Sequence, residues 1–362
     1  MKEMKDKEKE KELKQKVEEN GYKYVKYISA GSYGAVLEVK KGNWTYALKI
    51  VDKNNNYGTT RENVREIRGP NLVKISLEKE KKNYYIYVME RSFIGSIDRI
   101  NKYLYSNMLF KNPFEEYFGD NLMRFLAKQM VYGIRTFYQG NFVHFDIKPN
   151  NMLLFKDLEV KFIDFGFLKQ FSPDKKDIIQ GGTLGYFSPE YFQENRKGFD
   201  YDTLMKQDYF AIGSTIFMLK YGKPLVHRNF CRNYNIKDKH YFYCIMMDSI
   251  QRGINFIRSQ PFQDNEFSQF LCNLIQYNPE DRLDFEKMIR NKWLNKNTEE
   301  IKKIQIINVC NEDNLLLELQ KSDFLINNKK YFRKDFKEKN KINDKKYKYN
   351  KKGKFTFRKR VK

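Results

Sequence analysis

Cysteine and histidine are scarce in this chain, and long apolar runs are absent. Its 362 residues include four cysteines that are widely spaced and form no Cys-x-x-Cys pair, so neither a zinc knuckle nor a disulfide scaffold is indicated. No run of about eighteen apolar residues occurs, and the first residues alternate Lys with Glu, which argues against a secretory signal and a membrane span. We therefore expect a protein of a reducing compartment, cytoplasmic or nuclear.

Apolar and basic residues are plentiful instead. Apolar residues make up 41% of the chain and aromatic residues 16%, which is enough surface to bury for a packed globule. The net charge is +23, and residues 329–362 carry 17 Lys or Arg against 3 acids. This tail also contains aromatic rings, a pattern that suits a nucleic acid or another acidic partner. Solvated disorder and a compositional bias toward Lys, Asn, Ile, Tyr and Phe explain the same pattern.

The hydrophobic periodicity divides the chain into parts. Residues 1–20 predict a charged extension, helical and with almost no apolar face, because seven Lys and seven acids alternate between Lys2 and Glu19. An ordered domain is expected to begin near Tyr22. Short β-rich bursts predict three strands in a meander over 22–51 and two more strands, and later apolar spacings of three and four predict helices. The further strands are expected at 72–77 and 84–89, and the helices at 60–68, 122–137, 208–221, 267–276 and 283–294.

Four separated motifs carry chemistry, and the first is a glycine-rich turn between two predicted strands. Glycines let backbone N–H groups approach phosphate oxygens that a side chain would block, although an ordinary hairpin has the same composition. The turn comprises Ile28, Ser29, Ala30, Gly31, Ser32, Tyr33, Gly34, Ala35 and Val36.

The second motif contains Ala47 and Lys49, which lie two residues apart on a predicted strand and therefore share a face. This arrangement leaves room for a flat ring beside a cation, unless Lys49 faces solvent.

The third motif is the most specific. HFDIKPNN, from His144 to Asn151, places an acid that can accept a hydroxyl proton, a cation and an amide within six residues. A polar turn explains Pro149 but not the spacing of Asp146, Lys148 and Asn151. The fourth motif is the β-rich run that ends at Asp164 and Gly166, where an acid at a strand end can bind Mg²⁺ together with phosphates.

In this order the motifs resemble those of the eukaryotic protein kinase family, from Tyr22 to about Leu294. The resemblance implies an α+β fold with two lobes, a small β-rich N-lobe over 22–91 and a large helical C-lobe over 92–294, followed by an extension over 295–328 and the tail over 329–362. It also implies an ATP-dependent serine/threonine kinase that uses Mg²⁺ and a protein substrate. Asp146 would be the catalytic base, Lys148 would act beside it, and Asn151 with Asp164 would bind Mg²⁺.

The same resemblance assigns the nucleotide site. Gly31, Gly34 and Val36 would cover ATP, and Lys49 would hold its α- and β-phosphates. Met89 would be the gatekeeper. Glu90 and Ser92 would lie on the hinge and offer backbone groups to adenine, so that the identity of their side chains would matter little.

The segment from Asp164 to Glu190 would be the activation segment. Glu190 is expected to pair with Arg282, and Asp208 is expected at the start of a buried helix, where it would brace the catalytic loop. Lys148 and Thr183 match serine/threonine rather than tyrosine kinases, and Phe167 resembles the residue associated with a preference for serine.

Three positions depart from the family pattern. Ser29 replaces the first glycine of the turn, a change that does not exclude ATP binding. Glu62 is the expected partner of Lys49, with Glu66 as the alternative, because the segment up to Gly69 is short. Phe145 replaces the arginine that reads a phosphate on the activation segment, so that control by phosphorylation at Ser172 or Thr183 is not expected.

Two other classes remain as alternatives. A pseudokinase that acts as an ATP-binding scaffold would keep the fold and lose a catalytic group, yet Lys49, Asp146, Asn151 and Asp164 are all retained. A kinase of small molecules is disfavoured because residues 183–190 resemble a peptide-docking loop.

Overall fold

The computed structural model of the chain describes residues 2–31, 34–53, 67–92, 94–98, 120–155, 159–172, 174–179, 181–193, 198–226, 239–260 and 265–296. Of the positions expected in the site, Ser32, Tyr33, Glu62 and Glu66 lie outside these residues, as do the basic tail and most of the helix expected at 60–68. The backbone of Ala30 and Gly31 is described.

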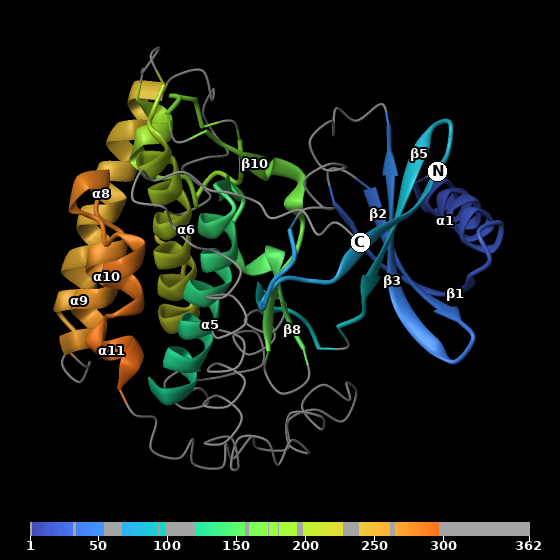
Figure 1. The fold of residues 1–362 in the computed structure, drawn as a ribbon, viewed down its shortest axis with the longest axis horizontal. Coiled ribbons are helices and arrows are strands. Elements are labelled where there is room, and N and C mark those ends of the chain that lie inside the picture. Colours follow the sequence, from blue (N-terminus) through green and yellow to red (C-terminus); the bar gives the residue numbers. More distant parts are fainter. Residues whose placement is uncertain are drawn as a thin grey trace, which may run out of the picture. The chain divides into compact units, whose positions relative to one another are not determined.

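The N-terminal part contains a five-stranded antiparallel sheet in the order β1-β2-β3-β5-β4 (Figure 1). The predicted meander and the strand at 84–89 are confirmed, whereas the strand expected from Leu72 begins three residues later. Leu72 instead forms an isolated parallel bridge with Phe162 of the C-lobe. The strands are β1 (Lys23–Gly31), β2 (Gly34–Lys41), β3 (Trp44–Asp52), β4 (Ile75–Glu80) and β5 (Tyr84–Glu90).

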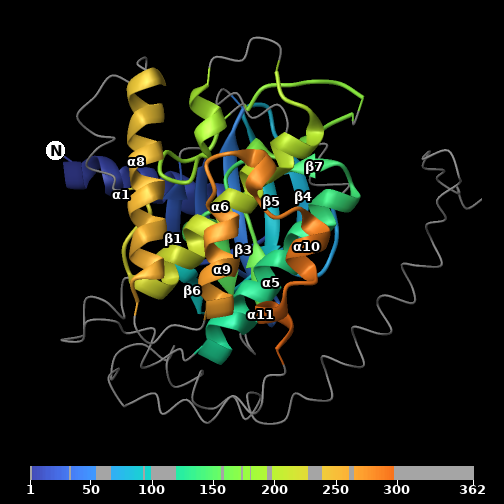
Figure 2. The ribbon, with the colours of Figure 1, turned by 90° about the vertical axis from the view of Figure 1, so that its left-hand side faces the viewer.

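Helices make up most of the C-terminal part (Figures 1 and 2), so the predicted α+β architecture with a β-rich and a helical lobe is confirmed. Two small sheets lie beside the helices, β10 with β7 and β6-β8-β9. The helices are α5 (Asp120–Gln139), α6 (Tyr201–Tyr221), α8 (Lys239–Arg258), α9 (Asn265–Leu274), α10 (Phe285–Ile289) and α11 (Lys292–Asn295). The short strands are β6 (Gly95–Ser96), β7 (Phe142–Val143), β8 (Met152–Leu154), β9 (Val160–Phe162) and β10 (Lys169–Gln170).

Two predicted helix boundaries were wrong. The buried helix α6 begins at Tyr201, where the side chain of Asp200 accepts a hydrogen bond from the backbone N–H of Thr203, so Asp208 lies inside the helix and not at its start. The helix expected at 283–294 is divided into α10 and α11, because Asn291 caps a new helix by accepting a hydrogen bond from Trp293 N.

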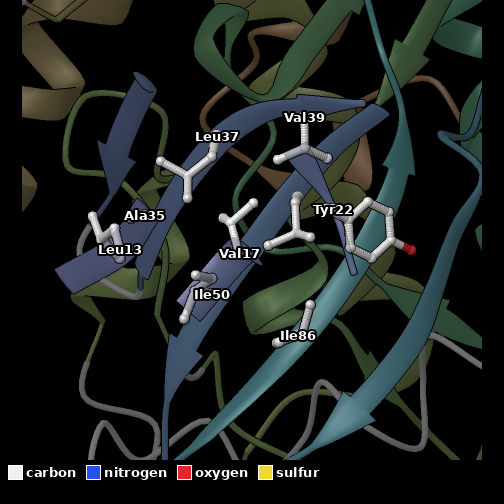
Figure 3. Packing of buried hydrophobic residues seen from close by; sticks show 9 residues of the cluster. Leu13, Val17, Tyr22, Ala35, Leu37, Val39, Ile50 and Ile86 are labelled. Atoms are coloured by element: carbon white, nitrogen blue, oxygen red, sulfur yellow. The ribbon is translucent and has the colours of Figure 1, made fainter. Parts of the chain in front are cut away.

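The N-terminal helix α1 (Lys2–Glu18) covers the outer face of the sheet (Figures 1 and 3). Its only buried side chains among those described before Asn20 are Leu13 and Val17, which are four residues apart and therefore on one face. They pack against Leu37, Ile50 and neighbouring apolar residues of the sheet. The expectation of a solvated helix with almost no apolar face was therefore wrong, because two apolar side chains suffice to attach the C-terminal half of α1.

The end of α1 is also held in place. Gly21, at φ 80°, turns the chain back toward the sheet, and the buried Asn20 donates a hydrogen bond from Nδ2 to Lys16 O at 2.6 Å. Tyr24 of β1 donates its hydroxyl hydrogen to Glu10 at 2.5 Å, and Lys16 lies 4.9 Å from the ring centroid of Tyr84 on β5. The packed N-lobe thus includes α1 as well as the sheet that starts at Lys23.

Candidate active site

The segment from His144 to Asn151 connects β7 with β8 and lies in the interior. Val143 is fully buried at its start, and Pro149 opens a 3₁₀ turn over Pro149–Asn151, a position where its missing N–H is not needed. Asp146 is 4% exposed and Asn151 is 6% exposed. A local turn between two short buried strands therefore brings the charged and amide groups of this motif together.

The carboxylate of Asp146 is the centre of this cluster. Thr183 donates its hydroxyl hydrogen to Oδ1 at 2.5 Å, and Lys148 donates from Nζ to Oδ2 at 2.8 Å and to Thr183 Oγ1 at 2.6 Å. Asn151 donates from Nδ2 to Oδ2 at 2.7 Å and to the backbone oxygen of Asp146 at 2.8 Å. The structure thus brings these four expected residues into direct contact, although Thr183 is remote from the others in sequence.

Asp164 connects this part of the C-lobe with the sheet of the N-lobe. It follows β9 with a left-handed backbone, at φ 62°, and its Oδ1 accepts a hydrogen bond from Lys49 Nζ of β3 at 2.7 Å. Burial raises the pKa of Asp164, but the charge and the hydrogen bond of Lys49 outweigh it and hold that pKa below its usual value. Asp164 is therefore ionised at neutral pH.

Asp164 and Asn151 present oxygen ligands of the kind that a hard cation requires. Both side-chain hydrogen bonds of Asn151 use its amide nitrogen Nδ2, which leaves the amide oxygen for a metal ion. Within the described part of the chain no group of three or more His, Cys, Asp and Glu side chains could hold a metal ion by itself. One carboxylate and one amide oxygen fit Mg²⁺, which usually keeps few protein ligands and takes the rest from phosphates and water.

The segment from His144 to Asn151 is held in place by Asp208. The carboxylate of Asp208 accepts hydrogen bonds from His144 N at 2.7 Å and from Phe145 N at 2.9 Å, and the residue is fully buried. Burial raises the pKa of Asp208 to about 7, although the two N–H donors act in the opposite direction. Asp208 makes this contact although it lies in the interior of α6 and not at the start of the helix, where it was expected.

His144 has a role that the sequence reasoning did not assign. Its ring packs edge-on against Phe137 of α5 and against Phe165, which follows Asp164, with centroids 5.4 and 5.9 Å away. Burial lowers the pKa of His144, so the imidazole is neutral, and its Nδ1 accepts a hydrogen bond from Asp146 N at 3.3 Å. His144 therefore connects the catalytic loop with the segment that carries Asp164.

Phe145 belongs to a buried cluster of aromatic rings. It is 1% exposed, its backbone has a φ of 63°, and its ring meets that of Phe171 edge-on at a centroid distance of 5.8 Å. Phe171 in turn contacts Tyr201 at the start of α6. A Cβ on Gly182 would lie 2.3 Å from Phe145 O, so only glycine fits where the activation segment passes the loop. Apolar packing thus fills the place of the family's arginine.

The ion pair expected between Glu190 and Arg282 is present. Arg282 donates from Nη1 to Oε1 at 2.5 Å and from Nη2 to Oε2 at 2.7 Å, and neither side chain is more than 1% exposed. Its remaining donors reach the backbone oxygens of Lys206, Gln276 and Tyr277. This bidentate pair fixes Glu190 to the segment between α9 and α10.

The strand register places the expected nucleotide residues in two neighbouring rows on the inner face of the sheet. Val36 is paired with Lys49, and Ala47 with Met89. Gly34 has a φ of 155°, and a Cβ there would lie 2.2 Å from Ile50 O, which explains why glycine is required. Ser29 pairs with Val36, Ala30 with Ala35 and Gly31 with Gly34 across the hairpin, and Ile28 lies next to them in β1.

The hinge side chains do more than the sequence suggested. Glu90 accepts two hydrogen bonds from Lys161 of β9, both at 2.9 Å, and Ser92 donates its hydroxyl hydrogen to Leu154 O at 2.5 Å. Arg91, which lies between these two residues, donates from Nε to Glu38 of β2 at 2.9 Å. These side chains therefore have structural contacts that the sequence did not suggest, whereas the approach of adenine to the backbone of Glu90 and Ser92 stays a prediction. Glu38 could have been noticed as an acid inside an apolar strand.

Comparison with known proteins agrees with this architecture of two lobes and a shared site. The protein kinase domain family matches residues 22–294. The serine/threonine-protein kinase PLK4 of Drosophila virilis is 23% identical over 289 residues, which cover 75% of this chain and 33% of that protein. The serine/threonine-protein kinase AtPK2/AtPK19 of Arabidopsis thaliana is 25% identical over 289 residues, which cover 75% of this chain and 54% of that protein.

The β-rich lobe and the helical lobe meet at this site, where Lys49 of the sheet contacts Asp164. The chain belongs to the protein kinase family, as the match over 22–294 shows, and the relatives named above are of the serine/threonine type. The chain spans about a third of the length of its PLK4 relatives. None of the described helices is long and apolar enough to cross a membrane.

Proposed function

We propose that this chain is an active serine/threonine protein kinase, which transfers the γ-phosphate of Mg-ATP to a hydroxyl group of a protein. The single observation that carries the proposal is the convergence of Lys148, Asn151 and Thr183 on the carboxylate of Asp146. A chain that had kept only the fold would not need this set of partners. The pseudokinase alternative has no observation in its favour.

Asp146 acts as the base in this proposal, accepting the proton of the substrate hydroxyl. Thr183 and Lys148 orient its carboxylate, and Lys148 also offers positive charge to the phosphoryl group in transfer. Thr183 belongs to the segment of this chain that would bind the protein substrate. Its hydroxyl group therefore connects that segment with Asp146, the proposed base.

Lys49 binds the α- and β-phosphates, while the backbone of Gly31 and Gly34 covers them. Ala47 leaves room for adenine, and Met89 limits the depth of its pocket. Asn151 and Asp164 would hold Mg²⁺, which would supply positive charge to neutralise the phosphates.

We further propose that the activation segment does not require a phosphate to adopt its active arrangement. Phe145 offers no guanidinium to a phosphate, and its contact with Phe171 supplies apolar packing in that place. The ion pair of Lys169 with Asp177, at 2.6 Å, also ties this segment together without a modification.

The test is phosphotransfer from Mg-ATP to an array of peptides in which each sequence occurs with serine and with threonine. Asp146→Asn should lower kcat by about 10²- to 10⁴-fold, the range expected for loss of a general base. Asp202→Asn, an exposed acid on α6, is the matched control and should leave kcat unchanged. Wild-type activity no greater than that of Asp146→Asn would refute the enzyme proposal.

A further inference from the structure

Glu38 is unusual because it is a buried acid inside an apolar strand. Its neighbours in β2 are apolar, namely Val36, Leu37 and Val39. Glu38 as a whole residue is 8% exposed. A carboxylate with so little access to water is stable only with a partner that replaces its hydration. The identity of that partner therefore indicates why an acid is present here.

The partner lies on the hinge. Arg91 directly follows β5 and donates from Nε to Glu38 Oε2 at 2.9 Å, and the two side chains are only 12% and 10% exposed. Lys26 of β1 also lies 3.9 Å from the same oxygen, but its side chain is mostly exposed and contributes little. The close and sheltered contact is the one between Glu38 and Arg91.

The pair lies on the nucleotide side of the sheet. Glu38 is directly opposite Ala47, and Ala47 is directly opposite Met89, so these three side chains form one row across β2, β3 and β5. The next row contains Val36 and Lys49 on the same face. The opposite face, with Leu37 and Leu48, packs toward α1. Glu38 therefore lies in the same row as Ala47 and Met89, on the face of the sheet that would contact adenine.

The connection joins two parts that a nucleotide would have to fit between. β2 belongs to the glycine-rich hairpin, whereas Arg91 belongs to the hinge, and β3 lies between β2 and β5. On its other side the hinge is fixed by Glu90, which binds Lys161 in the strand that leads to Asp164. Arg91 thus fixes the hairpin to a hinge that is already held by the C-lobe.

We propose that Glu38 and Arg91 are a positioning pair. The pair fixes the glycine-rich hairpin relative to the hinge, at the separation that ATP needs in order to bind between them. This inference rests on the proposed function, because it assumes that the site binds ATP. Neither residue touches the reacting atoms. Breaking the pair should weaken nucleotide binding and leave the phosphoryl-transfer step itself nearly unchanged.

The test compares Glu38→Gln, Arg91→Gln, the double variant and the exchanged pair Glu38→Arg with Arg91→Glu. Each single variant should raise the KM for ATP about tenfold with kcat within about twofold, as expected for the loss of one charge-assisted hydrogen bond. The double variant should be no worse than either single variant, because both remove the same contact. The exchanged pair should recover part of the affinity.

Lys41→Gln is the matched control, since Lys41 lies on the same strand, pairs with Glu78 and does not reach the hinge. It should leave the KM for ATP within about twofold of the wild type. The affinity for Mg-ADP, measured by calorimetry on the full chain, is the second readout, and it stays informative if phosphotransfer is too slow to follow.

The outcomes separate the two proposals. Additive effects of Glu38→Gln and Arg91→Gln, or unchanged nucleotide affinity in both, would overturn the positioning pair while leaving the kinase proposal intact. Should Glu38→Gln fail to fold, Arg91→Gln and the exchanged pair decide by the same criterion. A wild-type chain that binds Mg-ADP but transfers no phosphate would refute the kinase proposal alone, and one that binds no nucleotide would refute both.

Discussion

Removing the apolar anchor of α1 should destabilise the N-lobe, and Leu13→Ala is the simplest such change. Leu13 is 7% exposed and Val17 is fully buried within the cluster shown in Figure 3. Leu13→Ala deletes three buried carbons and Val17→Ala deletes two, at about 0.8 kcal/mol for each. We therefore expect losses of about 2.4 and about 1.6 kcal/mol in the free energy of unfolding, and about 4 kcal/mol for the double variant.

The measurement is urea unfolding of the full chain, followed by circular dichroism. Lys11→Ala is the matched control, because Lys11 is exposed on the same helix and alanine is an excellent helix former, so its free energy of unfolding should change by less than about 0.5 kcal/mol. A double variant that differs from the wild type by less than about 1 kcal/mol would refute the reasoning, since α1 would then contribute nothing to the fold.

Two further changes test the supports of the catalytic loop and the activation segment. Glu190→Ala should cost about 3 to 5 kcal/mol in urea unfolding, because it leaves the buried guanidinium of Arg282 without its carboxylate, and a loss below about 1 kcal/mol would contradict this. Asp208→Asn tests a pH dependence. Since burial raises the pKa of Asp208 to about 7 in the folded state, its contribution to stability is fully present below its unfolded pKa near 4 and is lost as the pH rises to about 7. The stability of the wild type relative to Asp208→Asn should therefore fall between pH 4 and pH 8, and a constant difference would exclude this coupling.

Much of the fold was accessible from local patterns. Strands β1 to β3 and β5 and helix α5 follow from apolar periodicity, and the catalytic loop follows from one eight-residue motif. Helix α8 was not predicted, although Phe242, Met246 and Ile250 recur every four residues along it and are buried. The boundaries of α6 and of α10 and α11 were missed because they depend on single capping residues.

The contacts between distant segments were less accessible. The burial of Leu13 and Val17 could not be predicted from the sequence around them. It depends on an apolar face that β1, β2, β3 and β5 form together only in the folded sheet. Glu38 and Arg91 are 53 residues apart, and only the strand register shows that they are neighbours. In contrast, the family resemblance anticipated the pair of Glu190 and Arg282, because both positions belong to recognisable motifs.

The burial of Phe145 limits which side chains can occupy its position. Phe145→Arg would bring a guanidinium against the ring of Phe171 at a position that is only 1% exposed, and an unpaired buried charge is strongly destabilising. An arginine at this position would therefore need compensating changes in Phe171 or in the residues around it. The rings of Phe145 and Phe171 are thus coupled, and replacing either one changes the surroundings of the other.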